Sequence, residues 1–343
     1  MIRYLGFRLL QAVGVLWAAW TVSFLVLYVL PGDPVKILIG PDASDVSPAQ
    51  LAKLRHQLGL DQPLIVQYLH QLGNLLQGRF GTSIGSGRPV IDVVGEAIGP
   101  TVQIALFGLV LAVVFGGGLA FLATLTRFRR LGQFLLGLPP LGVSIPGFWF
   151  ALLLIQWFSF GIPLFPAIGD QSASALVLPA ITLALPTGAT IAQLLSKSLV
   201  STLREPYIDT AWAKGASRGR IHLRHALRNA ALPALTVSGL IVGQLLSGTV
   251  VTETIFSRPG LGRVTATAVQ QQDIPVVQGV VLFAATVFVL ANLLVDLIYP
   301  LLDPRIVLTG SRRRLRKQLE AGLLAPLPDE SAVPAPVSEG ATR

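Results

Sequence analysis

Apolar residues occur along the chain in six stretches of about 20 or more positions, separated by polar segments. A bilayer core about 30 Å thick requires roughly 20 mostly apolar residues per helix, because lipid offers the backbone no hydrogen-bond partner and a helix satisfies its own polar groups. The pattern therefore predicts an all-α integral membrane protein with six transmembrane helices, at residues 9–30, 101–124, 134–160, 176–199, 232–252 and 279–302.

The third and fourth stretches contain prolines within their predicted helices. Pro139, Pro140 and Pro146 fall in the third, and Pro179 and Pro186 fall in the fourth. Proline lacks the amide hydrogen and its ring clashes with the preceding turn. Both helices are therefore predicted to be kinked or broken.

The composition and the distribution of charge predict how the chain is oriented in the membrane. Of the residues, 52% are hydrophobic and 13% are charged, about half the charged share of soluble domains. The formal net charge is +9, and Lys and Arg gather before the first stretch and after the second, fourth and sixth. Since cytoplasmic loops hold the excess of these residues, both termini are predicted to be cytoplasmic. The basic charge thus indicates orientation in a lipid bilayer and not a nucleic-acid partner.

This orientation assigns each segment to a region. The first apolar run exceeds the core of a cleaved secretion signal, so its helix is expected to be retained. The regions are an N-terminal transmembrane helix at 1–30, a large extracytoplasmic loop with short helices at 31–100, a five-helix core at 101–309 that includes a cytoplasmic loop at 197–231, and a basic, then disordered tail at 310–343.

One helix is predicted within the extracytoplasmic loop. Ser47 is a favourable N-cap and Pro48 a favourable first helical residue. Leu51, Leu54 and Leu58 follow at helical spacing. The segment is therefore expected to form a short amphipathic helix.

The common patterns of enzymes and metal sites are missing from the sequence. There is no cysteine and no G-x-x-x-x-G-K-[ST] phosphate loop, so the chain itself is not expected to hydrolyse ATP. Residues 81–85, GTSIG, match the G-x-S-x-G pattern of serine hydrolases, but their context predicts a glycine-rich loop. The four histidines form no H-E-x-x-H pattern. Neither catalysis nor a bound cofactor or metal is expected of this chain.

The largest cytoplasmic loop contains a short amphipathic helix. Pro206 is a favourable start and Gly215 a favourable end. An apolar stripe lies between them at Tyr207, Ile208, Ala211 and Trp212. Ser217 can cap a second, basic helix that runs to Asn229, before Pro233. Periodicity alone leaves two interpretations of the stripe open: it packs on the membrane bundle or lipid interface, or it fits a groove of a soluble partner.

A resemblance favours the second interpretation. Asp209-Thr210-Ala211, followed after three residues by Gly215, resembles the EAA loop of ABC importer permeases, in which a coupling helix docks onto the ATPase. The wider run, YIDTAWAKGAS with RHALRNAALPALT, is similar to the form in peptide-transporter permeases. Asp209 stands where Glu is usual, and the interval from Gly215 to Pro233 is longer than in the general pattern.

The resemblance extends over residues 1–309 and is to the first, B-type membrane subunit of dipeptide and oligopeptide ABC importers. The motifs that carry it are PGDPV at 31–35, LGLDQPL at 58–64, FGTS at 80–83, ETIFSRPGLGR at 253–263, DIPVVQGVV at 273–281 and NLLVDLIYPLLDPRI at 292–306.

This resemblance implies a permease fold in the bacterial cytoplasmic (inner) membrane, forming half of a pathway for di- or oligopeptides. The implied partners are a homologous second permease, two ATPase subunits or domains that bind ATP and Mg, and an extracytoplasmic substrate-binding protein. The implied ATPase-coupling residues are Glu205, Tyr207, Asp209, Thr210, Ala211, Trp212, Lys214, Gly215 and Arg218. Similar permeases serve nickel chelates, glutathione or haem, and these substrates remain alternatives.

Small residues on two stretches are either packing seams or pore lining. Such residues let helix backbones approach closely. They are Gly116 and Ala120 on the second stretch, and Gly239, Gly243 and Ser247 on the fifth.

Three polar residues are further candidates for the pathway. Glu253, at the outer end of the fifth stretch, is a candidate contact for the binding protein or for the outer mouth. Asn292 and Asp296 share a face of the sixth stretch, where a carboxylate serves function or a structural ion pair. The alternative class of protein is a transporter driven by an ion gradient. Such a transporter uses ionisable residues inside its spans, and in this sequence Asp296 is the one that lies clearly within a predicted span.

Overall fold

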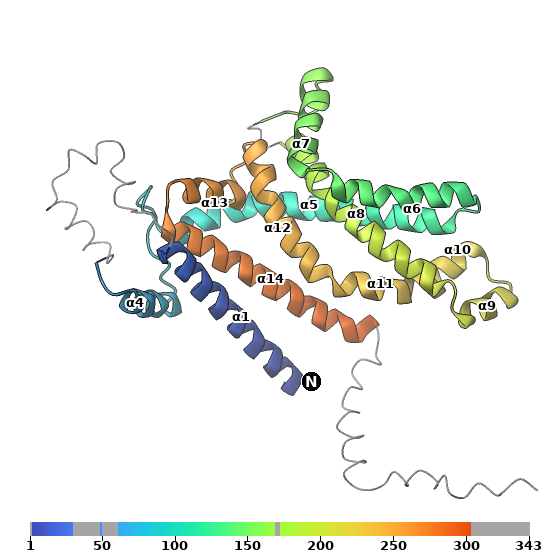
Figure 1. Cartoon of the computed structure of the whole chain (residues 1–343), viewed down its shortest axis with the longest axis horizontal. Coiled ribbons are helices and arrows are strands. Elements are labelled where there is room, and N and C mark those ends of the chain that lie inside the picture. Colours follow the sequence, from blue (N-terminus) through green and yellow to red (C-terminus); the bar gives the residue numbers. More distant parts are fainter. Residues whose placement is uncertain (1, 30–48, 50–60, 169–171, 303–343) are drawn as a thin grey trace, which may run out of the picture. The chain divides into compact units, whose positions relative to one another are not determined.

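The described part of the chain is helical. A computed structural model describes residues 2–29, 49, 61–168 and 172–302 (Figure 1). Within these ranges there is no β-strand, only an isolated antiparallel bridge between Thr82 and Pro89. The helices are α1 (Ile2–Val29), α4 (Leu64–Leu76), α5 (Val90–Leu125), α6 (Arg129–Ser144), α7 (Gly147–Ile155), a π-helical turn (Gln156–Gly161), a 3-10 turn (Ser174–Leu176), α8 (Val177–Thr202), α9 (Pro206–Ala213), α10 (Arg218–Arg220), a second π-helical turn (Ile221–Ala226), α11 (Leu227–Thr236), α12 (Ser238–Ile255), α13 (Leu261–Gln270) and α14 (Ile274–Leu302).

Four to six of these elements are candidate membrane spans. Single helices provide four spans, at Gly6–Tyr28, Val90–Leu125, Ser174–Thr202 and Ile274–Val295. Two bent pairs provide the others, Arg129–Ser144 with Gly147–Gly161 and Arg218–Ala234 with Gly239–Ile255. Taken together they follow the six predicted stretches in order, which confirms the all-α membrane fold.

The prolines break one span and leave another continuous. α6 and α7 meet at an angle of 96°, with Pro146 at the junction, so the predicted break in the third stretch is confirmed. The fourth stretch is kinked or broken in the prediction, and it is not broken in the structure, because α8 continues through Pro186. Pro179 is the third residue of α8, where the backbone amide has no partner within the helix. A proline there removes no helical hydrogen bond.

α5 and α8 form the centre of the bundle and approach each other through small residues. The buried face of α5 includes Gly108, Ala112, Gly116 and Ala120. A Cβ atom on Gly116 would lie 2.2 Å from the carbonyl oxygen of Gly188 in α8. The two backbones are therefore in contact, and for the second stretch the packing interpretation is confirmed.

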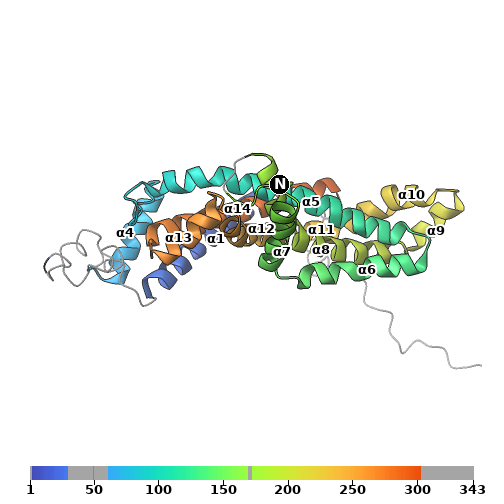
Figure 2. The same ribbon diagram turned by 90° about the horizontal axis from the view of Figure 1, so that it is seen from above.

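Two apolar clusters mark the two ends of α5. Near its start, Val90 and Val94 pack with residues of α13 and α14. Near its end, Ala120 packs with residues of α8, α9 and α11. Val94 and Ala120 are about 39 Å apart at 1.5 Å per residue, more than the roughly 30 Å of the bilayer core. The clusters lie at opposite ends of the bundle (Figures 1 and 2), farther apart along α5 than the bilayer core is thick.

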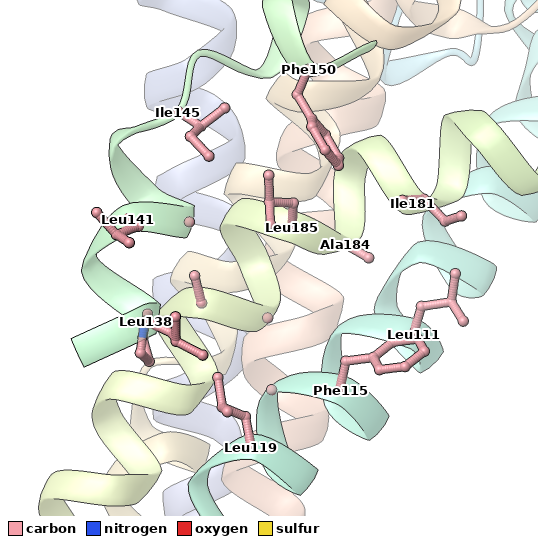
Figure 3. A pocket seen from close by; sticks show the side chains of 15 residues that line it. Leu111, Phe115, Leu119, Leu138, Leu141, Ile145, Phe150, Ile181, Ala184 and Leu185 are labelled. Carbon is pink, nitrogen blue, oxygen red and sulfur yellow. The ribbon is translucent and has the colours of Figure 1, made fainter. Parts of the chain in front are cut away.

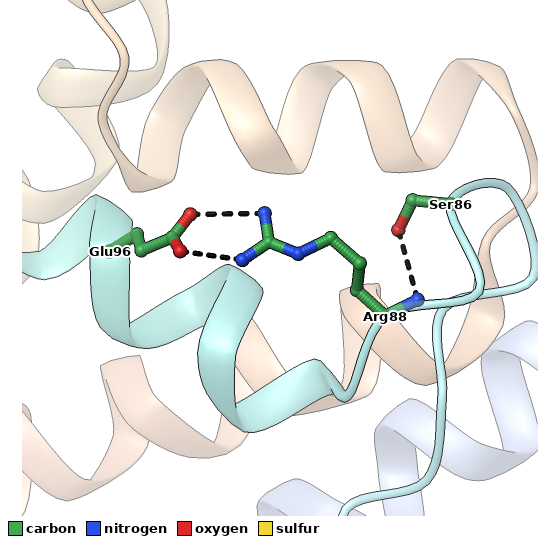
Figure 4. Close-up of polar contacts among 3 residues, drawn as sticks. All are labelled: Ser86, Arg88 and Glu96. Atoms are coloured by element: carbon green, nitrogen blue, oxygen red, sulfur yellow. Dashed lines mark hydrogen bonds and ion pairs between the residues drawn. The ribbon is translucent and has the colours of Figure 1, made fainter.

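α5 begins earlier than the apolar pattern predicts. Its first residue is Val90 and Pro100 lies inside it, so the expected helix boundary at residue 100 is wrong. Arg88, just before the helix, is held to Glu96 by two contacts of 3.1 and 2.5 Å, and its backbone amide lies 3.4 Å from the Ser86 hydroxyl (Figure 4). Because Arg88 and Glu96 are exposed, their ion pair contributes little to the stability of the fold. It links the segment before α5 to the second turn of that helix.

The segment before α5 also contains α4, which the sequence pattern did not single out. The helix predicted after Ser47 lies outside the described residues. Contacts divide the chain into two compact units, Met1–Val295 and Asp296–Arg343. Of the second unit the structure describes only residues 296–302, at the end of α14. The bundle and the sites below belong to the first unit.

Candidate functional site

The bounds of α9 agree with the sequence pattern. The helix spans Pro206–Ala213, and Gly215 follows with φ of +77°, a left-handed conformation that favours glycine. The Gly215 amide donates to the Trp212 carbonyl at 2.9 Å, and the Ala216 amide donates to the Ala211 carbonyl at 3.1 Å. These two bonds form a Schellman motif, which satisfies the last carbonyls of a helix. The prediction that Gly215 ends the helix is confirmed.

The apolar stripe of α9 divides into a buried and an exposed half. Ile208 is 1% exposed and Ala211 is 8% exposed. Both belong to one cluster with Leu195 and Leu199 of α8 and Ala120 of α5. α9 is therefore fixed to the ends of the two central helices. Ala211, one of the residues implied for ATPase coupling, turns its methyl group toward the bundle.

The other half of the stripe remains accessible. Trp212 is 47% exposed and Tyr207 is 39% exposed. Polar neighbours are also exposed, and we call them together with Tyr207 and Trp212 the exposed face of α9: Glu205, Tyr207, Asp209, Thr210, Trp212 and Lys214. The buried half of the stripe thus packs on the bundle, and the exposed half is accessible to a partner.

A hydroxyl group ties α9 to the helix that leads back into the membrane. Asn229 donates its amide hydrogen to the Tyr207 hydroxyl oxygen at 2.9 Å, and that hydroxyl donates to the His225 carbonyl at 3.3 Å. Tyr207 thus joins the two legs of the loop while its ring remains partly accessible. Its place in the stripe suggested a purely apolar role, and this tether was not predicted.

The second leg differs from the single basic helix that was predicted. Ser217 precedes it without a hydrogen bond from its side chain, so the expected capping role of the Ser217 hydroxyl is wrong. The helix runs through a π-helical turn at Ile221–Ala226 and past Asn229 to Thr236, with Pro233 inside it. Apolar packing against the bundle, through Ile221 and Ala226, supplies the stability that the cap was expected to provide.

A buried histidine lies in that π-helical turn. His222 is 2% exposed, and its Nδ1 atom lies 3.0 Å from the Arg218 carbonyl oxygen. Its ring meets the edge of Phe121 of α5, with 5.7 Å between ring centroids. From the sequence, the histidines were considered only as possible metal ligands. The spacing of residues in the sequence did not show that the His222 ring is buried. Arg218 itself is exposed, as a partner contact requires.

At the other end of the bundle, the GTSIG loop is held by a buried aspartate. Asp273 is 3% exposed and accepts hydrogen bonds from the Ser83 hydroxyl at 2.5 Å and from the amides of Ile84 and Gly85 at 3.1 Å. It also receives the amide of Val276 at 3.4 Å, at the start of α14. Ser83 is 5% exposed, and its hydroxyl is used in the hydrogen bond that holds the loop to Asp273. This agrees with the prediction of a loop without a nucleophile.

Glu253, near the carboxyl-terminal end of α12, is fully buried. Its carboxylate contacts the Thr101 hydroxyl at 2.6 Å and accepts the amides of Gly262 at 2.7 Å and Arg263 at 3.3 Å. A Cβ atom on Gly260 would lie 2.3 Å from the same carboxylate. Glu253 therefore caps α13 and joins it to α5. Glu253, the candidate contact for the binding protein or the outer mouth, thus has its carboxylate inside the bundle in this structure.

This arrangement predicts a strong effect of Glu253→Ala on stability. The substitution leaves buried donors without an acceptor, at about 1–3 kcal/mol each. We expect the thermal unfolding midpoint of the purified protein to fall by about 5–10 °C. Thr254→Ala, at an exposed neighbouring position, is the control and should change the midpoint little. Equal midpoints for the two variants would contradict the capping role.

The candidate pathway residues on α12 mostly meet α14. A Cβ atom on Gly239 would lie 2.2 Å from the Asn292 side chain, and one on Gly243 would lie 3.8 Å from the Phe288 ring. For these glycines and Asn292 the structure therefore shows a packing seam. Ser247 is exposed and remains a candidate. The side chain of Asp296 lies outside the described ones.

An apolar pocket of about 380 Å³ lies between α5, α6, α7 and α8 (Figure 3). Leu111, Phe115, Leu138 and Phe150 are among the side chains that line it. Its lining residues are all apolar, and they include glycines and a proline. Such a lining gives no side-chain partner to the charged ends of a peptide.

These features define a class of protein. A helical membrane bundle carries, at one end, a short helix with an anchored face and an exposed aromatic face. Residues 108–308 match the family model described as "Binding-protein-dependent transport system inner membrane component". Residues 1–95 match the model "Binding-prot-dependent transport system membrane comp, N-term". The chain belongs to this family of ABC importer permeases.

Relatives along nearly the whole chain agree with this assignment. The "Glutathione transport system permease protein GsiC" of Escherichia coli K12 is 38% identical over 307 residues, which cover 89% of this chain and 99% of the relative. Proteins of the same name from Salmonella typhimurium LT2 and Shigella dysenteriae serotype 1 show the same identity and coverage. The chain is a multi-pass inner-membrane permease subunit of an ABC importer, and separate subunits hydrolyse ATP.

Proposed function

We propose that this chain forms half of the translocation pathway of an importer for short peptides and that α9 transmits the motion of the ATPase. One observation carries the proposal. α9 buries Ile208 and Ala211 in the bundle while Tyr207 and Trp212 remain accessible on its other side. A helix of this kind can hold a soluble partner and move with the membrane helices at once.

Coupling follows from the attachments of α9. Ile208 and Ala211 pack against α5 and α8, so a displacement of α9 moves the ends of the two central helices. Tyr207 passes the same displacement to α11 through Asn229. When ATP closes the ATPase dimer, the exposed face of α9 makes contacts with the closed dimer that it does not make with the open dimer. That difference shifts the spans between inward-facing and outward-facing arrangements.

The charge around α9 supports a cytoplasmic position for this end. The exposed cations beside it are Lys214, Arg218, Arg220, Arg224 and Arg228. Cytoplasmic segments hold the excess of Lys and Arg. In this orientation both termini are cytoplasmic, and α4 and α13 lie on the outer side, where a substrate-binding protein delivers its ligand to this permease and a homologous second one.

The motifs at 31–35, 253–263 and 273–281 support di- or oligopeptides as the substrate class. Glutathione, itself a tripeptide, is the second candidate because the relatives at 38% identity are permeases of glutathione transport systems. Both candidates carry charged ammonium and carboxylate groups, for which the side chains of the apolar pocket offer no partner. Selection among peptides is therefore assigned to the substrate-binding protein.

The proposal is tested by uptake into proteoliposomes that contain the assembled importer and its binding protein. We expect ATP to raise the uptake of a labelled dipeptide or tetrapeptide at least about tenfold, and an ATPase-inactive complex is the matched control. Uptake of glutathione alone would select the second candidate. Uptake driven by an ion gradient with inactive ATPases would contradict the proposed coupling.

A further inference from the structure

α4 turns polar side chains inward. Gln67 is 7% exposed, and its amide donates to the Gln62 carbonyl at 2.7 Å. Gln71 donates to the Tyr28 hydroxyl of α1. The side of α4 that meets the rest of the chain is thus partly polar, the reverse of a helix on the surface of a soluble protein.

Apolar side chains occupy the opposite, outward side of α4. Ile65, Leu69 and Leu76 are 64%, 59% and 81% exposed. Their spacing places them on one face, which we call the outer stripe of α4. The helix, LIVQYLHQLGNLL, contains no Asp, Glu, Lys or Arg. His70, an exposed polar residue, lies about 120° around the axis from the middle of the stripe.

The contacts with α1 fix the depth of α4. Tyr68 shares a hydrogen bond of 2.8 Å with Thr21 and meets the edge of Phe24, with 5.3 Å between ring centroids. The span Gly6–Tyr28 has 23 residues and is about 34 Å long, close to the roughly 30 Å of the bilayer core. The end of α1 that carries α4 therefore lies at the boundary between hydrocarbon and headgroups.

We propose that α4 lies in the membrane interface at the carboxyl-terminal end of α1, with its outer stripe inserted among the lipid acyl chains. Val22, Leu25 and Val26 of α1, the helix that α4 contacts, are also exposed apolar side chains, as expected of a span that meets lipid. A water-soluble partner does not reach the hydrocarbon at this depth. An amphipathic helix with its apolar face buried in lipid is stable there. α4 thus anchors the segment between α1 and α5 to the bilayer.

The test uses the natural absence of cysteine. Single cysteines replace Leu69, Leu76 or, as the control, His70, and each carries a nitroxide spin label in the assembled importer in phosphatidylethanolamine–phosphatidylglycerol nanodiscs. Collision rates with oxygen, which concentrates in lipid, and with a water-soluble nickel complex are measured. We expect the ratio of oxygen to nickel collisions to be at least about threefold higher at 69 and 76 than at 70.

Three results would overturn the inference. Equal ratios at the three positions would place the outer stripe in water. Protection of 69 and 76 from both reagents would show that protein covers the stripe. Protection that develops only when the substrate-binding protein is added would assign the stripe to that partner.

Discussion

Replacement of Trp212 by alanine is expected to lower ATP-driven uptake at least about tenfold while the amount and thermal stability of the permease stay unchanged. Trp212 is 47% exposed on a helix whose opposite face is anchored. Exposed tryptophans that enter a partner's pocket commonly contribute 2 kcal/mol or more to binding, and 1.4 kcal/mol is a factor of ten. Uptake and co-purification of the ATPase subunits are the two measurements.

Two further variants separate coupling from folding. Val269→Ala removes an equally exposed apolar side chain from α13, at the other end of the bundle, and should leave ATPase association unchanged. Ile208→Ala removes a buried side chain of α9 and should lower stability by about 2–5 kcal/mol. Normal association and uptake with Trp212→Ala would refute the proposed role of the exposed face.

Gly116→Val should have the largest effect on the fold itself. The new Cβ atom would meet the Gly188 carbonyl oxygen at 2.2 Å, a contact with backbone that no rotamer change relieves. α5 and α8 must separate, and with them the core of the bundle. We expect a loss of about 3 kcal/mol or more, measured as a lower unfolding midpoint and a lower yield of folded protein.

The neighbouring glycine provides a matched control for this variant. A Cβ atom on Gly117 would meet nothing within 4 Å, apart from its own helix and chain neighbours. Gly117→Val therefore adds the same side chain to the same helix without a clash. The two variants should differ clearly in midpoint, and similar midpoints would contradict the close approach of α5 and α8.

The spans and the bounds of α9 were predictable because local physics determines them. A bilayer accepts only long apolar helices, and this requirement is visible in any window of about 20 residues. Pro206 and Gly215 act through their own backbone conformation, so the limits of α9 needed no tertiary information. The membrane fold and the position of α9 followed from these signals.

The division of the α9 stripe was not predictable, because it depends on residues far away in the sequence. Ile208 is buried by Ala120, Leu195 and Leu199, and periodicity does not reveal which half of a stripe meets such partners. The burial of Glu253 was missed for the same reason, since its partner Thr101 lies 152 residues away in the chain. Position at the end of a span suggested exposure, whereas tertiary contacts determined burial.

The central claim is that the exposed face of α9 docks on the ATPase, and site-specific cross-linking tests it most directly. Single cysteines replace Thr210, Ala211 or Ala213 in the otherwise cysteine-free chain, and each carries a benzophenone group in the assembled importer. Thr210 and Ala213 are exposed, whereas Ala211 is buried. We predict cross-links to the ATPase from 210 and 213, and at most weak ones from 211. Cross-links from 210 and 213 to lipid or to this chain alone, with none to the ATPase, would contradict the account.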